Sequence, residues 1–143
     1  MNKMGLFGKP KAKKKILFAC VENSARSQMA EAFFRKYSPK DYEAISGGTS
    51  PRGMLNPLAV QVMKEAGIDI SNHKAKGISE EMIRSSTQAI NMGCMDKSIC
   101  PSAIIPKMID WDIEDPKDKP IEMVREIRDQ IEQKIKEFVS SLE

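Results

Sequence analysis

A cysteine, five further residues, an arginine and a serine stand between an apolar run and a helix-forming run. The apolar residues 16–19 predict a strand and residues 28–34 a helix, so the loop between them would lie at a helix start. Such a loop points backbone N–H groups at one place, where Arg26 could add two parallel donors to a tetrahedral oxyanion. The same positive field favours the thiolate of Cys20, which is its nucleophilic form. We therefore predict an oxyanion-binding loop formed by Cys20, Val21, Glu22, Asn23, Ser24, Ala25, Arg26 and Ser27.

The spacing alone also fits an inert cysteine, because free cysteine is among the most buried residue types. Two more reactive groups follow predicted strands: Cys94 comes after residues 87–92 and Asp115 after residues 108–113. Ligands of open parallel sheets bind beyond the carboxyl ends of the strands, where the strand order reverses. Three reactive groups at such ends favour an active site over an inert cysteine.

The elements that must position these groups follow from hydrophobic periodicity and from helix stop signals. We predict the order β-α-β-α-α-β-β-α. The strands are expected at 15–19, 42–46, 87–92 and 108–113, and the helices at 26–37, 57–66, 80–85 and from Pro120 onward. Gly47 and Gly48 are expected to break regular structure. The order predicts an α/β single domain, with a four-stranded parallel sheet flanked by helices on both faces.

The composition is that of an ordinary globular chain, with 143 residues, 41% hydrophobic and 30% charged. Much of the formal charge of +3 falls in the first fifteen residues. We therefore expect a flexible basic tail at 1–14, a domain at 15–143 and no nucleic-acid partner. No apolar run approaches ~18 residues, so we expect no membrane contact. Three cysteines without an export signal indicate a cytoplasmic location and thiols that are kept reduced for chemistry. We also expect a monomer.

Several segments together carry a resemblance to a known family. They are 20–33 (CVENSARSQMAEAF), 56–60 (NPLAV), 67–71 (GIDIS), Gly93-Cys94 with Cys100-Pro101, and 111–116 (WDIEDP). In these segments the chain resembles the thioredoxin-coupled arsenate reductases, which share the low-molecular-weight protein tyrosine phosphatase fold. The resemblance extends from Lys15 to the C-terminus and implies a role in arsenical resistance.

The resemblance implies a role for each residue of the first step. Cys20 would attack arsenate, and Arg26 with the loop amides would bind it, with phosphate and sulfate as competing anions. Asn23 would brace the loop from inside. Ser27 would hydrogen-bond the sulfur and keep it ionised, and Asp115 would protonate the departing oxygen.

It also implies a relay of thiols without a cofactor or a metal. Cys94 would attack the adduct on Cys20, releasing arsenite and leaving a disulfide between the two cysteines. Cys100 would then attack Cys94, and thioredoxin would reduce the final disulfide. The electrons balance, because arsenate takes up two and two thiols supply two on forming one disulfide.

The sequence departs from its relatives at three places. Ala25 stands where many relatives carry another cysteine. Lys74 and Lys76 lie where some relatives have oxygen ligands of a potassium site, and a lysine ammonium could replace that cation. Lys117 and Asp118 follow Asp115-Pro116 where the phosphatases have tyrosines.

Three other interpretations remain open. Cys20, Arg26 and Asp115 would suffice for a low-molecular-weight phosphatase that hydrolyses phosphate monoesters through a cysteinyl-phosphate. The same fold could serve as a regulatory oxyanion-binding module. Zinc could be imagined on the three cysteines and His73, but no Cys-x-x-Cys pair is present. We interpret His73 as a structural turn residue.

Overall fold

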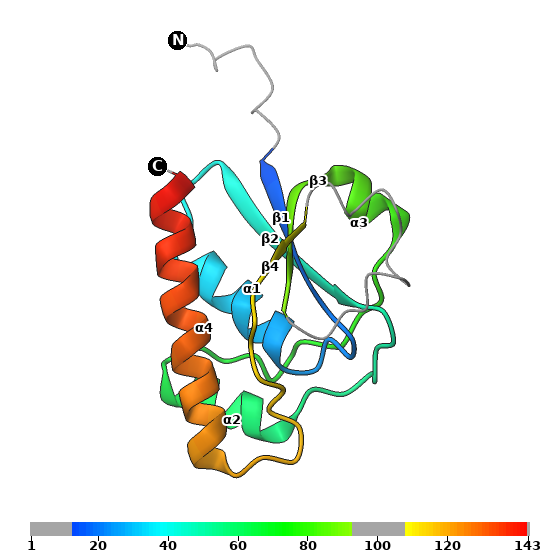
Figure 1. Cartoon of the computed structure of the whole chain (residues 1–143). Helices are drawn as coiled ribbons and strands as arrows, with labels where there is room; N and C mark the ends of the chain where they lie inside the picture. Colours follow the sequence, from blue (N-terminus) through cyan, green and yellow to red (C-terminus); the bar gives the residue numbers. More distant parts are fainter. Residues whose placement is uncertain (1–12, 93–107, 143) are drawn as a thin grey trace.

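The strand that leads into the cysteine loop lies at the centre of the sheet. It is β1 (Lys14–Cys20), and its side chains alternate between two hydrophobic clusters. Ile16 and Phe18 face one cluster, while Leu17 and Ala19 face the other. A strand that is buried on both faces must have helices on both sides. The computed structural model describes residues 13–92 and 108–142, and Figure 1 shows their arrangement.

All pairings in the sheet are parallel, and the strand order is β2-β1-β3-β4. The other strands are β2 (Tyr42–Gly48), β3 (Ser86–Asn91) and β4 (Met108–Asp110). The chain moves outward from β1 to β2 and then returns to the other side of β1 to form β3. The strand order therefore reverses between β1 and β3, where this type of fold forms its ligand crevice.

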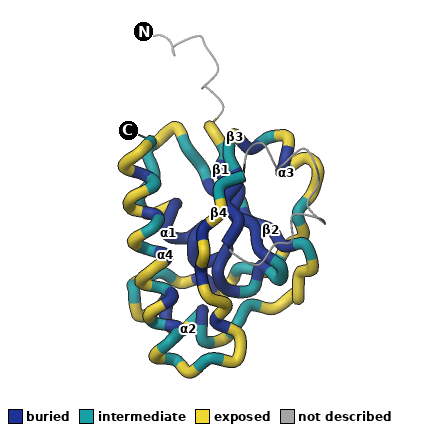
Figure 2. Tube along the Cα trace, in the orientation of Figure 1, coloured by how far each residue is buried: buried dark blue, intermediate teal, exposed yellow. Residues whose placement is uncertain are grey.

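The helices are α1 (Arg26–Tyr37), α2 (Pro57–Glu65), α3 (Glu80–Ser85) and α4 (Ile121–Leu142). Buried residues of α1, α2 and α4 share the larger cluster with one face of β1. Ile83 of α3 belongs to the smaller cluster on the other face. Figure 2 shows β1 and α1 among the most deeply buried parts of the molecule, while the edge strand β4 is more exposed. The expected fold and element order are confirmed.

Local sequence signals account for the helix ends. The Asn56 side chain caps α2 by accepting from the Leu58 N–H at 2.9 Å, and Pro57 is its first residue. Ser79 caps α3 by accepting from the Met82 N–H at 3.1 Å. In α4, Val124, Ile127, Ile131, Ile135 and Val139 are buried. Burying each of these aliphatic side chains contributes about 1.5–3 kcal/mol, which fixes the helix on α1.

Two predicted strand ends were wrong by more than one residue. β2 continues through Gly47 and Gly48 to pair with the whole of β1, with Cys20 opposite Gly48. Gly48 fits this strand end because the cysteine loop passes directly over it, and a Cβ atom at Gly47 would lie 3.0 Å from the Ile78 side chain. β4 ends at Asp110 rather than Ile113. The chain leaves the sheet there, because Trp111 and Ile113 turn into the core.

No helix in the described part of the chain is long and apolar enough to cross a membrane.

Candidate active site

The predicted oxyanion-binding loop joins the carboxyl end of β1 to the first turn of α1. Its middle residue, Asn23, is fully buried and has a φ of 54°, the left-handed conformation that asparagine tolerates better than most residues. Ala25 precedes the helix and supplies no side-chain cap. The N–H groups of the first helical turn have no partners within the helix. They are therefore available to an anion, which the helix dipole also favours.

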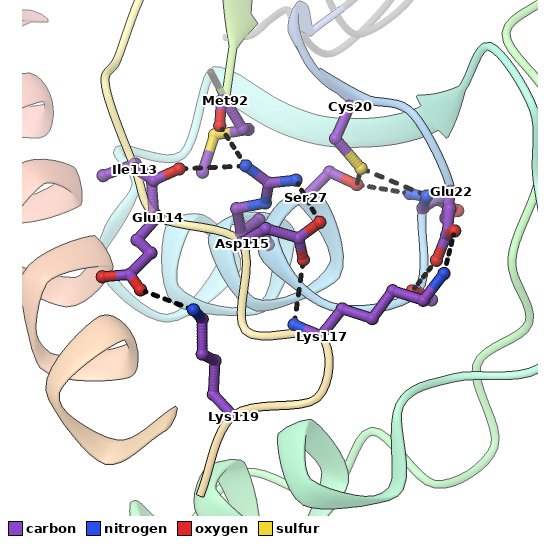
Figure 3. Close-up of polar contacts among 12 residues, drawn as sticks. Cys20, Glu22, Ser27, Met92, Ile113, Glu114, Asp115, Lys117 and Lys119 are labelled. Carbon is purple, nitrogen blue, oxygen red and sulfur yellow. Dashed lines mark hydrogen bonds and ion pairs between the residues drawn. The ribbon is translucent and has the colours of Figure 1, made fainter. Parts of the chain in front are cut away.

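The sulfur of Cys20 has two donors from this loop (Figure 3). The Asn23 backbone N–H donates to it at 3.1 Å, and the Ser27 hydroxyl lies 3.0 Å away. The Asn23 side-chain amide donates to the Ser27 oxygen at 2.7 Å. Because that oxygen already accepts a hydrogen, the Ser27 hydroxyl hydrogen is free to point at the sulfur. Both donors then stabilise negative charge on Cys20, which is 3% exposed.

Neighbouring segments hold the Asn23 side chain in this orientation. Its carbonyl oxygen accepts from the Lys76 backbone N–H at 2.8 Å and from the Gln28 amide at 2.9 Å. Its amide nitrogen also donates to the Ser46 hydroxyl at 3.1 Å. The backbone donor decides which end of the amide is oxygen, since a backbone N–H can only donate. Sequence reasoning missed Gln28 and Ser46, although both stand beside predicted loop or strand ends.

Arg26 links the loop to two other strand ends. Its Nη1 donates to the Met92 carbonyl at 3.1 Å and to the Ile113 carbonyl at 2.9 Å. Its Nη2 lies 3.4 Å from the Asp115 carboxylate. The side chain is 7% exposed. Two carbonyl acceptors therefore fix the guanidinium plane before any substrate arrives, and the other nitrogen faces the acid.

The structure places Cys20, Arg26 and Asp115 around one pocket. Its volume is about 170 Å³, and it is lined by residues 20–22 and 24–26 together with Asp115 and Lys117. Since one liquid water occupies ~30 Å³, the pocket has room for a tetrahedral oxyanion of five atoms. A larger groove of about 420 Å³, lined also by residues 52, 54–58, 116, 118 and 119, shares Glu22, Ser24, Ala25, Asp115 and Lys117 with it.

Gly48 makes the close approach of the loop possible. A Cβ atom at Gly48 would lie 2.4 Å from the Val21 carbonyl oxygen and 3.0 Å from the Asn23 nitrogen. Both are backbone atoms, which cannot move aside without moving the loop. The absence of a side chain at Gly48 therefore allows the cysteine loop to pack directly against the end of β2.

Cys94 and Cys100, which sequence reasoning assigned to the relay, lie outside the described residues. Within 13–92 and 108–142, no group of three His, Cys, Asp or Glu side chains could hold a metal ion. His73 lies at a turn, where its N–H donates to the Ile70 carbonyl and its ring nitrogen meets the Gln28 side chain at 3.3 Å. The Lys76 ammonium lies 3.9 Å from the buried carboxylate of Glu31.

Comparison with known proteins bears on what such a pocket does. The low molecular weight phosphotyrosine protein phosphatase family matches residues 15–143. An arsenate reductase of Staphylococcus aureus is 39% identical over 132 residues, which are 90% of this chain and 98% of that protein.

Solved structures similar to this chain include both an arsenate reductase and a phosphatase. The thioredoxin-dependent arsenate reductase of Corynebacterium glutamicum has a TM-score of 0.76 and 33% identity, covering 91% of this chain and 62% of that one. An arginine phosphatase of Geobacillus stearothermophilus has a TM-score of 0.81 and 29% identity, covering 90% of this chain and 92% of that one.

Proposed function

We infer that the chain, which belongs to the low molecular weight phosphotyrosine protein phosphatase family, is an arsenate reductase. It reduces arsenate to arsenite, a step of arsenical detoxification. The observation that carries this conclusion is its 39% identity to an arsenate reductase over nearly the whole of both chains. Within the family, three cysteines distinguish a two-electron reduction from hydrolysis, for which one cysteine is enough.

The pocket accounts for the first step. Arsenate sits against the loop amides and Arg26, and the Cys20 thiolate attacks the arsenic. A sulfur–arsenic bond forms while an oxygen leaves, and Asp115 supplies the proton that lets it leave as water. Arg26 and the loop amides neutralise the charge of the oxyanion throughout.

The second step is the reduction itself. The Cys94 thiolate attacks the sulfur of Cys20, and the electron pair of the sulfur–arsenic bond passes to arsenic. Arsenite leaves, and two thiols have become one disulfide. Cys100 then attacks Cys94, which returns Cys20 to its thiol form. These roles of Cys94 and Cys100 rest on the family resemblance.

A protein dithiol must reduce the final disulfide, and we propose thioredoxin or a close equivalent. The C. glutamicum neighbour is described as thioredoxin-dependent. A reducing cytoplasm would keep the three thiols ready for the cycle. We also propose that the monomer is the working unit, because one chain supplies Cys20, Arg26 and Asp115 to one pocket.

Phosphate monoester hydrolysis is the second candidate. The loop, Arg26 and Asp115 would serve a cysteinyl-phosphate as well as an arsenic adduct, and an arginine phosphatase shares the fold. The groove beside the pocket lacks aromatic side chains among residues 52, 54–58 and 115–119. A phosphotyrosine ring would therefore find no aromatic wall there.

The deciding experiment couples arsenate reduction to thioredoxin and runs beside an aryl-phosphate assay. We expect Cys94→Ala to abolish arsenate turnover and to retain any aryl-phosphate hydrolysis. Arsenate turnover by Cys94→Ala with thioredoxin would show that the relay is wrong. Aryl-phosphate hydrolysis without arsenate reduction by the native chain would favour the phosphatase.

The order of the relay has its own test. We expect Cys100→Ser to complete one turnover and stop with a disulfide between Cys20 and Cys94. Mass spectrometry of the digested, non-reduced protein would detect the linked peptides. A Cys100→Ser protein that released arsenite without forming this linkage would contradict the order.

A further inference from the structure

The carboxylate of Glu22 connects three segments at the rim of the oxyanion pocket. Its Oε2 lies 3.3 Å from the Lys117 ammonium, and its Oε1 lies 3.7 Å from the Arg52 guanidinium. The Ser24 hydroxyl donates to Oε1 at 3.4 Å. Glu22 belongs to the oxyanion-binding loop, Arg52 to the segment after β2, and Lys117 to the segment that carries Asp115. Figure 3 shows the Lys117 side chain extending to the Glu22 carboxylate, and both residues line the pocket.

Lys117 contacts Asp115 as well as Glu22. Its backbone N–H donates to Asp115 Oδ1 at 3.0 Å, and this hydrogen bond restrains the orientation of the carboxyl group. The Asp115 side chain is 57% exposed, and its Oδ2 lies 3.4 Å from Arg26 Nη2. The acid therefore stands on an exposed turn, where few contacts determine its direction.

We propose that the Glu22–Lys117 ion pair is a latch that holds Asp115 over the oxyanion pocket. Glu22 and Lys117 are then positioning residues, which act on the reaction through Asp115. The latch connects the loop that binds the oxyanion to the segment that protonates the leaving oxygen. It rests on the proposed function only in using Asp115 as the acid.

The small energy of an exposed ion pair determines whether the latch is detected in folding stability or in reaction rate. Exposed ion pairs add little to folding stability, because solvent screens the charges and the long side chains lose freedom. Lys117 is 48% exposed and Glu22 28%. The latch should therefore change the rate of the Asp115-dependent step and leave thermal unfolding nearly unchanged. A small change in the direction of an acid is sufficient to slow proton transfer.

The charge of Glu22 predicts a second, opposite effect. A carboxylate at the pocket rim repels an incoming oxyanion, and the ammonium of Lys117 offsets this repulsion. Removing the Glu22 charge should strengthen arsenate binding while slowing the chemical step. Removing the Lys117 charge should weaken binding while slowing the same step.

The test measures single-turnover arsenite formation by the fully reduced protein over a range of arsenate concentrations. The variants are Glu22→Gln and Lys117→Met. The control is Lys119→Met, because Lys119 pairs at 3.3 Å with Glu114 of its own segment and does not reach the loop. Removing either lysine deletes one exposed positive charge from the same segment.

We expect both latch variants to lower the rate at saturating arsenate about two- to fivefold, while Lys119→Met stays near the native rate. The arsenate dissociation constant should fall in Glu22→Gln and rise in Lys117→Met. Equal rates for Lys117→Met and Lys119→Met would overturn the latch. Dissociation constants that move in the same direction in both latch variants would also overturn it.

A separate substrate keeps this test independent of the reductase assignment. If the native chain hydrolyses aryl phosphates and does not reduce arsenate, the proposed function fails and the latch is tested on the hydrolysis. Lys117→Met should then slow phenyl phosphate more than 4-nitrophenyl phosphate, because the better leaving group needs less help from the acid. Equal slowing of the two substrates would mean that Lys117 does not act through Asp115.

Discussion

The direction of the hydrogen bonds around Cys20 is decided by one backbone donor several segments away. The Lys76 N–H fixes the oxygen of the Asn23 amide, so the nitrogen of that amide must face Ser27 and Ser46. Ser27 then has its hydrogen left for the sulfur. The polar side chains in this buried loop thus leave the Ser27 hydroxyl hydrogen available to the Cys20 sulfur. A buried network of this kind is costly to leave half satisfied.

Ser27→Ala is expected to slow the alkylation of Cys20 near neutral pH. The substitution removes the hydroxyl that lies 3.0 Å from the sulfur and leaves the Asn23 N–H as the remaining donor of the pair. Less thiolate should be present at a given pH, because a donor to the charged form has been lost. Iodoacetamide consumption, followed in a Cys94→Ser, Cys100→Ser background, measures the change.

The control for this prediction is a serine that lies outside the network. Ser141→Ala removes a hydroxyl that donates to the Phe138 carbonyl near the end of α4. It should leave the alkylation rate at the native value. If Ser27→Ala also alkylated at the native rate, the hydroxyl would not be a donor to the sulfur.

At the scale of single residues, the sequence predicted the groups that have a chemical signature and missed those that depend on distant partners. Cys20 and Asp115 were predicted because a nucleophile and an acid follow predicted strands, and Arg26 because it stands at the helix start after the loop. The structure places all three around one pocket. Glu22 and Lys117 meet across 95 positions. No periodic pattern relates two residues so far apart, so only the folded chain reveals the pair.

At the scale of elements, β2 does more than pair with β1. Its last residue, Gly48, lies under the oxyanion-binding loop, and the Gly48 N–H and C=O bond to the backbone of Lys76 and Ile78. The sequence suggested a break at Gly47-Gly48, because consecutive glycines usually weaken a strand. Here the absence of a side chain at Gly48 leaves room for the loop, and pairing with β1 holds both glycines in the strand. Local propensity cannot show which segment will lie above a strand.

Gly48→Ala is expected to weaken phosphate binding at least tenfold and to lower stability by about 1–3 kcal/mol. The new Cβ would lie 2.4 Å from the Val21 carbonyl oxygen, so the loop must rise. The loop amides would then no longer converge on the anion. Isothermal titration with phosphate and chemical denaturation measure the two effects.

Gly77→Ala is the matched control, because Gly77 forms the isolated bridge to Gly48. A Cβ at Gly77 would have its nearest neighbour at 3.8 Å, which is an ordinary contact distance. This variant should bind phosphate like the native chain. Weakening of phosphate binding by the same factor in both variants would mean that the space under the loop is not the cause.

The contact between α2 and α4 should respond to pH through Glu65. Hydrogen bonds from Arg125, strengthened by the charges of Arg125 and Arg128, hold the pKa of Glu65 below its ordinary value of 4.5. A carboxyl group whose pKa is lower in the folded chain stabilises the fold above its unfolded pKa. That contribution is lost as the pH falls from about 4.5 through the lower folded value.

Glu65→Gln should therefore lower the melting temperature at pH 7 and make little difference at pH 3. Thermal unfolding at the two pH values measures the change. Glu81→Gln, which removes an ion pair within α3 alone, controls for the loss of one surface carboxylate. A destabilisation by Glu65→Gln that persisted unchanged at pH 3 would contradict the ion-pair explanation.

At the scale of the whole molecule, Arg26 connects the segments that follow three strands. Its side chain starts from the loop after β1 and bonds to carbonyls that follow β3 and β4. Removing it would leave two buried carbonyl oxygens without this donor, which typically costs about 1–3 kcal/mol each. Binding of an oxyanion to Arg26 is therefore linked to the global fold rather than to one loop.

A bound oxyanion should consequently raise the melting temperature of the whole chain. Phosphate at 100 times its dissociation constant adds about 2.7 kcal/mol to the free energy of unfolding. For a chain of 143 residues this corresponds to a shift on the order of 5–10 °C. Thermal unfolding in phosphate, compared with chloride at equal ionic strength, separates specific binding from general salt effects.

Two variants determine which groups hold the anion. Arg26→Lys should lose most of the phosphate-dependent shift, because an ammonium cannot bond to the two carbonyls and also present parallel donors to the anion. Cys20→Ser should keep the shift, since the loop amides and Arg26 remain and only the nucleophile is lost. It should nevertheless lose all turnover. A full phosphate shift in Arg26→Lys would mean that the amides alone bind the anion, and the guanidinium would then serve mainly to hold the strand ends together.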